Sequence, residues 1–292
     1  NKDMRKRGRD MEEERQGPTS LLVSLDEGYV PQLRVMLTSV YLNDPFRDHE
    51  LHLLHRSLSA VSLASIAECC ARYGFRFYPH VVADELFQDA PVTDRYPREM
   101  YYRLMAGELL PPQLEKVLYL DPDILVINPL TPLWDLELGE HLFAAAAHTG
   151  KTELSNSVNR IRLKVDHDYF NSGVLLMNLK ACRQRIRPQE LFAFVRAHEK
   201  ELLFPDQDVL NMCYGDHVQQ VEDALWNYDA RNYSSYMMRS GGRQDLQWVM
   251  THTAILHFCG RAKPWHPGYR YRFGMLYRHY MQLSERLSAR QS

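Results

Sequence analysis

Short apolar runs alternate with helical segments along the first part of this chain, and this alternation limits its possible folds more than any other feature. The runs expected to be strands are Leu21–Leu25, Glu50–Leu54 and Phe75–Val82, and between them apolar residues recur at helical spacing in Pro31–Leu42 and Leu58–Tyr73. Strands joined in this way by helices usually lie parallel in one sheet. The sequence therefore predicts an α/β fold with a mostly parallel sheet.

The same reading extends to the rest of the chain. Further strands are expected at Lys116–Leu120, Ile124–Ile127, Gly173–Asn178 and Ala254–Phe258, helices at Arg98–Leu110, Glu190–His198 and Asp206–Tyr214, and a polar loop at Ala83–Pro97. Because no repeat, low-complexity block or linker interrupts this pattern, we expect one domain over residues 18–268. Residues 1–17 form a charged arm or an expression remnant without the apolar core of a signal peptide, and residues 269–292 form a C-terminal helical extension.

Composition excludes several classes of protein. The 35 basic and 37 acidic residues give a net charge of −2, whereas bulk binding of nucleic acid needs a clear excess of Lys and Arg. The five cysteines include the adjacent pair Cys69 and Cys70 and lack the spacing of a zinc site or a disulfide framework, which fits a reducing cytoplasm. No run of 18 apolar residues is present, so we expect no membrane-spanning helix.

Acidic residues stand where two of the expected strands end. Asp26 follows the first strand, and Asp121-Pro122-Asp123 follows Lys116–Leu120. Ligands of open α/β sheets bind beyond the carboxyl ends of the strands. Paired carboxylates at such a place are typical ligands of Mg²⁺ or Mn²⁺. The alternative is a plain turn, which Asp-Pro commonly begins.

A histidine adds to this candidate site. His257 lies at the end of the expected strand Ala254–Phe258, next to Cys259-Gly260. A lone histidine on an apolar strand is often a satisfied core residue, and that alternative stays open. Together with Asp121 and Asp123 it would make a site of two carboxylates and one imidazole, which favours Mn²⁺ over Mg²⁺.

Six motifs, in this order and spacing, resemble glycosyltransferase family 8, the retaining enzymes that include bacterial lipopolysaccharide galactosyl- and glucosyltransferases and glycogenin. The motifs are Asp26-Glu27-Gly28-Tyr29, Tyr101-Tyr102-Arg103-Leu104, Leu120-Asp121-Pro122-Asp123-Ile124-Leu125, Phe170-Asn171-Ser172-Gly173-Val174-Leu175-Leu176-Met177-Asn178, Asp206-Gln207-Asp208-Val209-Leu210-Asn211 and His257-Phe258-Cys259-Gly260-Arg261-Ala262-Lys263-Pro264-Trp265. The resemblance implies a GT-A fold, which is a single Rossmann-like domain around a mixed sheet, with a UDP-sugar and Mn²⁺ bound at its centre.

The resemblance also implies a role for each matching residue. Asp26 would accept a hydrogen bond from uracil, with Ser24 and Tyr29 beside the nucleoside. Mn²⁺ on the diphosphate would be held by Asp121, Asp123 and His257, and the phosphates would be contacted by Gly260 and Lys263. The donor sugar would be surrounded by Arg103, Asn171, Asp206 and Gln207. One departure is Gly28, where many relatives have Asn.

Simpler explanations exist for three of these residues. Lys263 could be an ordinary surface or core lysine, Arg103 could pair with Glu99 four residues earlier, and Asp206 could cap the helix that it opens. Gln207 matches the position where a retaining enzyme needs a nucleophile. Because an amide is a poor nucleophile, we expect substitution on one face of the sugar through an oxocarbenium-like transition state.

The predicted function is a Mn²⁺-dependent retaining transfer of galactose or glucose from a UDP-sugar to a glycan or lipid-linked saccharide. The alternative is a non-catalytic protein that binds sugar nucleotides or glycans on the same fold. A nicotinamide dehydrogenase is disfavoured because G-x-G-x-x-G is absent. We expect His148–Asp168 and Asn227–Gln247 to face the acceptor, and Val92–Pro97 and Cys259–Lys263 to close over the bound donor.

The C-terminal segment Tyr269–Gln291 is basic and aromatic, with five arginines and one acid, Glu285. Such a helix can lie on the anionic inner face of a membrane. The alternative is a helix packed on the domain with its arginines in water.

Overall fold

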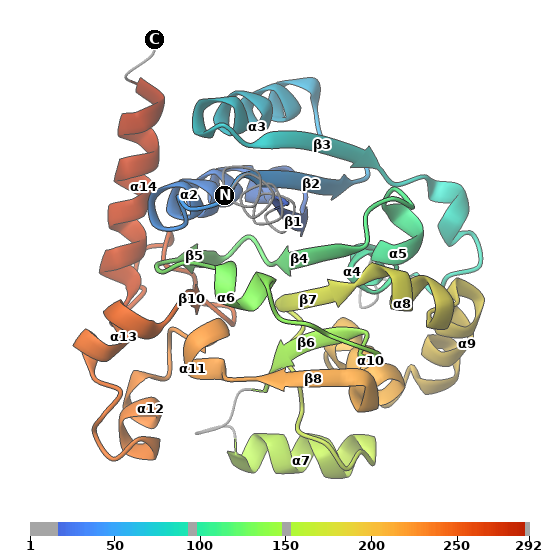
Figure 1. Ribbon diagram of the computed structural model, residues 1–292. Coiled ribbons are helices and arrows are strands. Elements are labelled where there is room, and N and C mark those ends of the chain that lie inside the picture. Colours follow the sequence, from blue (N-terminus) through green and yellow to red (C-terminus); the bar gives the residue numbers. More distant parts are fainter. Residues whose placement is uncertain (1–16, 93–97, 148–152, 290–292) are drawn as a thin grey trace, which may run out of the picture.

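A seven-stranded sheet runs through the part of the chain that the computed structural model describes, which is residues 17–92, 98–147 and 153–289 (Figure 1). In spatial order its strands are β3 (Arg76–Val81), β2 (His49–His55), β1 (Thr19–Ser24), β4 (Lys116–Leu120), β7 (Val174–Asn178), β6 (Phe143–Ala146) and β8 (Val218–Val221). All neighbours are parallel except that β7 runs antiparallel to β4 and β6. The prediction of a mixed, mostly parallel sheet is therefore confirmed.

A small second sheet contains β5 (Ile124–Val126), β10 (Ile255–His257) and β9 (Tyr228–Asp229), with β10 in the middle. His257 pairs with Ile124 of the antiparallel β5 and with Asp229 of the parallel β9. This pairing brings the end of β10 to the start of β5, directly after the Asp121-Pro122-Asp123 turn.

Helices cover both faces of the large sheet (Figure 1). The described α-helices are α2 (Val30–Asn43), α3 (Ala60–Tyr73), α4 (Glu99–Leu104), α5 (Ala106–Leu109), α6 (Thr131–Trp134), α7 (Glu153–Leu163), α8 (Leu179–Arg185), α9 (Pro188–His198), α10 (Pro205–Tyr214), α11 (Asp223–Trp226), α12 (Tyr233–Arg239), α13 (Leu246–His252) and α14 (Gly274–Ala289), with 3₁₀ turns at Glu27–Tyr29, Asp84–Phe87 and Gly215–His217. One core lies between the sheet and α2 and α3, and another between the sheet and α4, α5 and α8–α10.

Helix α3 shows how local sequence sets these bounds. Ser59 caps its first turn by accepting a hydrogen bond from the backbone N–H of Ser62. Gly74 ends it at a φ of 73°, a left-handed conformation that glycine adopts without the steric cost of a Cβ.

All the strands expected from the sequence are present, with ends that differ from the predicted ones by at most two residues. The single helix expected at Arg98–Leu110 is wrong, because the structure divides it at Met105 into α4 and α5. The break lets Gly107 approach α8, where an added Cβ would lie 3.3 Å from the backbone nitrogen of Arg183. The expected loop at Ala83–Pro97 contains the turn Asp84–Phe87, and its residues 93–97 lie outside the described part of the chain.

The C-terminal extension is a helix packed on the domain. Helix α14 begins at Gly274 rather than at Tyr269 and buries Tyr277 and Tyr280 against its neighbours. The hydroxyl of Tyr280 accepts a hydrogen bond of 2.7 Å from Asn43 of α2. Among the described residues, no helix is both long and apolar enough to cross a membrane. All five cysteines are free thiols.

Candidate active site

The Asp121-Pro122-Asp123 turn lies at the carboxyl end of β4, near the centre of the large sheet. Strand β4 ends at Leu120 between β1 and β7, and β5 begins at Ile124. The turn is thus fixed by a buried strand on each side, which holds both carboxylates at the edge where ligands of open α/β sheets bind.

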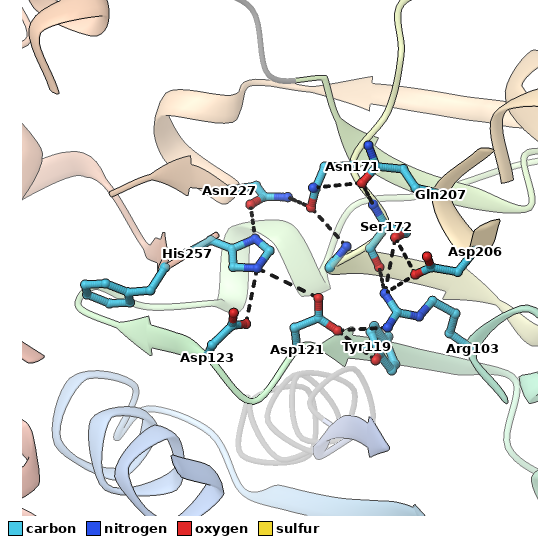
Figure 2. A network of polar contacts seen from close by, with 12 residues as sticks. Arg103, Tyr119, Asp121, Asp123, Asn171, Ser172, Asp206, Gln207, Asn227 and His257 are labelled. Atoms are coloured by element: carbon cyan, nitrogen blue, oxygen red, sulfur yellow. Dashed lines mark hydrogen bonds and ion pairs between the residues drawn. The ribbon is translucent and has the colours of Figure 1, made fainter. Parts of the chain in front are cut away.

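The structure brings His257 to these two carboxylates (Figure 2). One ligand atom from each of Asp121, Asp123 and His257 lies within 4.8 Å of the others. Nε2 of His257 is 3.2 Å from Asp123 and 3.8 Å from Asp121. The candidate ligands named from the sequence therefore form one cluster.

The space among these side chains suits a divalent cation. Gly173 faces it, and an added Cβ there would lie 2.6 Å from Oδ2 of Asp121 and even closer to the ring of His257. Oδ1 of Asp123 is buried without a well-aligned hydrogen bond from the described residues. Two carboxylates and an imidazole are a donor set for Mn²⁺ or a similar ion, so the residues present fit the metal that the sequence predicts.

Positive groups neutralise Asp123 in this structure. The ammonium of Lys263 lies on its carboxylate and also donates to the backbone oxygen of Phe258 at 3.0 Å. Burial opposes the ionised form of Asp123, but His257 and Lys263 hold the pKa of its carboxyl well below the usual value. Burial likewise opposes the imidazolium of His257, yet Cys259 and Asp123 raise its pKa well above the ordinary value.

Arg103 connects the Asp121, Asp123 and His257 cluster to the residues that the sequence predicts around the donor sugar. Its guanidinium lies 3.1 Å from Asp121 and 3.1 Å from Asp206, and it donates to the backbone oxygen of Ser172 at 2.9 Å. Burial opposes its charge, but Asp121 and the other acidic neighbours keep the pKa of Arg103 above its usual value. Arg103 therefore pairs with these two carboxylates, and the alternative of a pair with Glu99 is not what the structure contains.

Tyr119 is a site residue that the sequence reasoning missed. It is fully buried, its ring lies under Arg103 at 4.6 Å, and its hydroxyl donates to Asp121 at 2.8 Å. Burial raises the pKa of this phenol, which keeps the donated proton in place. The alternation of β4 could have suggested it, since Tyr119 is the only residue of that strand with both a ring and a polar end.

Asn171 and Gln207 lie together beside the metal cluster. The Asn171 amide donates to Oε1 of Gln207 at 3.0 Å, and Ser172 donates from its hydroxyl to Asp206 at 3.1 Å (Figure 2). All four residues expected around the donor sugar therefore belong to one connected network with Ser172, which was not singled out from the sequence.

A cavity of about 340 Å³ adjoins the cluster. Its lining includes Ser24, Asp26, Tyr29, Arg103 and Asp121, which are five of the predicted donor-site residues. Asp26 is exposed and accepts a hydrogen bond of 2.8 Å from the backbone N–H of Gly28.

The segment after His257 turns sharply at Gly260, where φ is 84°. Arg231 lies against this glycine and is itself held by Asp229 through hydrogen bonds of 2.9 and 2.7 Å. Of the two segments expected to close over the donor, Cys259–Lys263 thus lies against a partly buried ion pair. Residues 93–97 of the other one lie outside the described residues.

Capping of α10, the alternative role considered for Asp206, is not what the structure contains. The helix begins at Pro205, and the carboxylate of Asp208 accepts from the backbone N–H groups of Leu203 and Phe204 instead. Asn227, the first residue of a region expected to face the acceptor, is fully buried and contacts His257 at 2.9 Å. The other such region, His148–Asp168, begins with residues outside the described part of the chain.

A doubly covered mixed sheet, with an Asp–Asp–His cluster and an adjoining cavity at the carboxyl end of a central strand, places this protein among the GT-A transferases. The chain matches the model of "Glycosyl transferase family 8" over residues 20–268, and it belongs to that family. It is similar to the solved galactosyltransferase LgtC in complex with donor and acceptor sugar analogs, with a TM-score of 0.76 and 27% identity, covering 91% of this chain and 96% of that one.

Two curated proteins of similar length match as well. "General stress protein A" of Bacillus subtilis is 25% identical over 89% of this chain and 92% of its own length. A lipopolysaccharide 1,2-glucosyltransferase of Escherichia coli is 22% identical over 89% of this chain and 77% of its own length.

Proposed function

We propose that this protein transfers galactose or glucose from a UDP-sugar to a saccharide acceptor, with retention of configuration and with Mn²⁺ as cofactor. The observation that carries the proposal is the convergence of Asp121, Asp123 and His257 beside a cavity whose lining includes five other predicted site residues, which are Ser24, Asp26, Tyr29, Arg103 and Asp206. Family membership and the similarity to a galactosyltransferase and a glucosyltransferase support the choice of reaction and of sugar.

In this proposal, Asp121, Asp123 and His257 hold the ion, with Mg²⁺ as a possible substitute. The bound cation would stabilise the negative charge that develops on departing UDP. Asp26, Ser24 and Tyr29 bind the nucleoside, and Gly260 and Lys263 bind the phosphates. Lys263 now neutralises Asp123, so a cation at that carboxylate frees its ammonium for the diphosphate.

The sugar is oriented by Arg103, Asn171, Asp206 and Gln207 in this scheme. The oxygen of Gln207 already accepts from Asn171, which makes it a poorer nucleophile still. That contact supports substitution on one face of the sugar, where departing phosphate helps to deprotonate the acceptor.

A contact with an anionic membrane surface is part of the proposal. Arg270, Tyr271 and Arg272 line two adjoining cavities, and Arg278 adds charge to one of them. No described acidic residue lines either cavity, although Arg231 in the second one is paired with Asp229 behind it. Tyr271 and Met275 are exposed beside these arginines, a combination typical of surfaces that lie on lipid.

The test is release of UDP from UDP-galactose and UDP-glucose with and without Mn²⁺, together with calorimetry of UDP- and GDP-sugars. Turnover that needs the metal and prefers uridine supports the proposal. Metal-dependent binding without turnover, with acceptor present, would favour the alternative of a non-catalytic sugar-nucleotide or glycan-binding protein. Equal affinity for GDP- and UDP-sugars would contradict the uridine assignment.

A further inference from the structure

Asn227 lies between the candidate metal ligand and the sugar side of the site. It follows α11 and precedes β9, and its side chain is fully buried. Its Oδ1 is 2.9 Å from Nδ1 of His257, and its Nδ2 is 2.9 Å from Oδ1 of Asn171. One amide thus contacts both parts of the site (Figure 2).

The contacts continue from Asn171 to Gln207. The Asn171 amide donates through Nδ2 to Oε1 of Gln207 at 3.0 Å, and the backbone N–H of Ser172 lies 3.5 Å from the same oxygen. The side-chain amides of Asn227 and Asn171 therefore connect the imidazole of His257 to the amide of Gln207.

The direction of these hydrogen bonds follows from a single backbone group. The orientation of a side-chain amide and the tautomer of a histidine must be inferred from their partners. The backbone N–H of Gly173, which can only donate, lies 3.0 Å from Asn171 and makes its Oδ1 the acceptor. Oδ1 of Asn171 then accepts from Nδ2 of Asn227, and Oδ1 of Asn227 accepts from Nδ1 of His257.

This order has one consequence for His257. Nδ1 must carry a proton, so in the neutral imidazole the lone pair is on Nε2. Nε2 is the atom that faces Asp121 and Asp123 at 3.8 and 3.2 Å. The other neutral tautomer would turn that lone pair toward Asn227 and leave a proton where the cation must bind.

We propose that Asn227 is a positioning residue that selects the metal-binding tautomer of His257 and, through Asn171, fixes the orientation of Gln207. The inference rests on the proposed function, because it assumes that Asp121, Asp123 and His257 hold a cation. Outer hydrogen-bond partners of metal-binding histidines commonly set ring orientation and tautomer in this manner. Asn227 contacts Nδ1 of His257 in this way, and it also donates a hydrogen bond to Asn171 beside Gln207.

Two substitutions separate the two contacts of Asn227. Asn227→Leu has similar volume and removes both contacts. Asn227→Asp keeps an acceptor for Nδ1 of His257 but removes the donor to Asn171. A carboxylate oxygen of the new aspartate would then face Oδ1 of Asn171, and neither oxygen can donate a hydrogen bond. The matched control is Asn128→Leu, since the amide of Asn128 also donates two hydrogen bonds, of 3.0 and 2.8 Å, to the backbone oxygens of Met250 and Thr253 at the end of α13.

The first measurement is the tautomer of His257 in the metal-free protein. Long-range ¹H–¹⁵N correlation spectra of the imidazole report it at a pH where the ring is neutral. The variant His257→Gln identifies which signal belongs to His257. We expect the Nδ1–H form in wild type and in Asn128→Leu, and a mixture of both tautomers in Asn227→Leu. An unchanged tautomer in Asn227→Leu would overturn the proposal.

The second measurement is Mn²⁺ affinity by calorimetry, together with the kinetics of UDP-sugar hydrolysis. Losing an outer partner typically lowers metal affinity or activity by about 10- to 100-fold. We expect Mn²⁺ affinity to fall by that factor in Asn227→Leu. In Asn227→Asp it should stay within about threefold while kcat falls by about tenfold or more at an unchanged KM for donor.

The aspartate variant keeps the proposal testable if the leucine variant does not fold. Wild-type kcat in Asn227→Asp would overturn the link to Gln207. A wild-type protein that neither binds Mn²⁺ nor releases UDP would contradict the proposed function instead. The tautomer measurement is made without metal, so it would still test the role of Asn227.

Discussion

A guanidinium nitrogen of Arg231 lies 2.4 Å from the position that a Cβ on Gly260 would take. The arginine cannot easily withdraw, because Asp229, which is buried, binds two of its nitrogens. Gly260 also has a φ of 84°, a conformation that costs other residues about 1–2 kcal/mol. The segment Cys259–Lys263 is therefore closely fitted to its neighbour.

Gly260→Ala should displace this segment and weaken binding of UDP by about tenfold or more, a loss of about 1.4 kcal/mol, while the fold persists. Calorimetry with UDP and Mn²⁺ measures this effect. Adding Arg231→Ser should restore part of the affinity, since it removes the clash but not the backbone cost. Gly17→Ala, at a glycine with open space around it, is the control. Wild-type affinity in Gly260→Ala would show that the contact is unimportant.

Gly173→Ala should abolish metal binding with little effect on the overall fold. The new methyl group would lie 2.6 Å from Oδ2 of Asp121 and would press on His257, so it fills the space proposed for the cation. We expect Mn²⁺ affinity to fall by at least about 100-fold, on the scale of a lost metal-site interaction. Titration with Mn²⁺ followed by electron paramagnetic resonance of the free ion decides this, and an alanine variant that binds normally would place the metal elsewhere.

Asp123→Asn should abolish Mn²⁺-dependent release of UDP while circular dichroism stays that of the wild type. The substitution removes a proposed ligand and also the partner of Lys263. His257→Ala should weaken Mn²⁺ binding more mildly, because both carboxylates remain. Normal turnover of Asp123→Asn would mean that the metal assignment is wrong.

Two histidines at the edge of the large sheet should make the fold sensitive to acid. Nδ1 of the buried His52 lies 3.0 Å from Nε2 of His80. Burial, and then the charge of His80, lower the pKa of His52, although Glu50 opposes this, and burial also lowers the pKa of His80. The unfolded chain therefore takes up protons more readily than the folded one below about pH 6.5.

The contribution of His52 and His80 to the free energy of unfolding is thus complete above about pH 6.5. It is lost as the pH falls below this value, by at most about 1.4 kcal/mol per pH unit for each proton taken up. Urea unfolding at pH 7.5 and 5.5 measures the slope. His80→Gln should reduce the loss between these two values relative to wild type, and His279→Gln on α14 controls for removing an exposed histidine. An equal loss in wild type and His80→Gln would refute the assignment.

The parts of the fold with strong local patterns could be predicted from the sequence, and the parts that depend on distant contacts could not. Strand β4 and helix α2 are apolar runs with clear periods, and their bounds were found to within a residue. Strand β6 is built mostly of alanine, which has a weak preference for strands, and it forms because β7 and β8 pair with it on either side. The division of Arg98–Leu110 at Met105 depends on a close approach to α8, which leaves no local mark.

The residues of the candidate site likewise fall into those that the sequence predicts and those that it does not. Residues inside motifs, such as Asp123 and His257, were recognised and lie together. Tyr119 and Asn227 act through hydrogen bonds to residues 2 and 30 positions away, and nothing next to Asn227 in the sequence distinguishes it from an ordinary polar residue. The role of Asn227 becomes visible only when its partners are seen in space, whereas Tyr119 had a signal in the alternation of β4.

The amide of Asn43 binds three elements at once: the backbone of Ser39 in its own helix, the backbone oxygen of Val126 in β5, and the hydroxyl of Tyr280 in α14. Strand β5 begins one residue after Asp123, so the seating of the last helix and the position of that carboxylate share a strand. Any free energy that couples metal binding at Asp123 to the seating of α14 through β5 acts equally in both directions, because coupling between two binding events is reciprocal. A displacement of β5 on metal binding would therefore be transmitted through Asn43 to the last helix, and a change that loosens α14 would then lower the affinity for the cation.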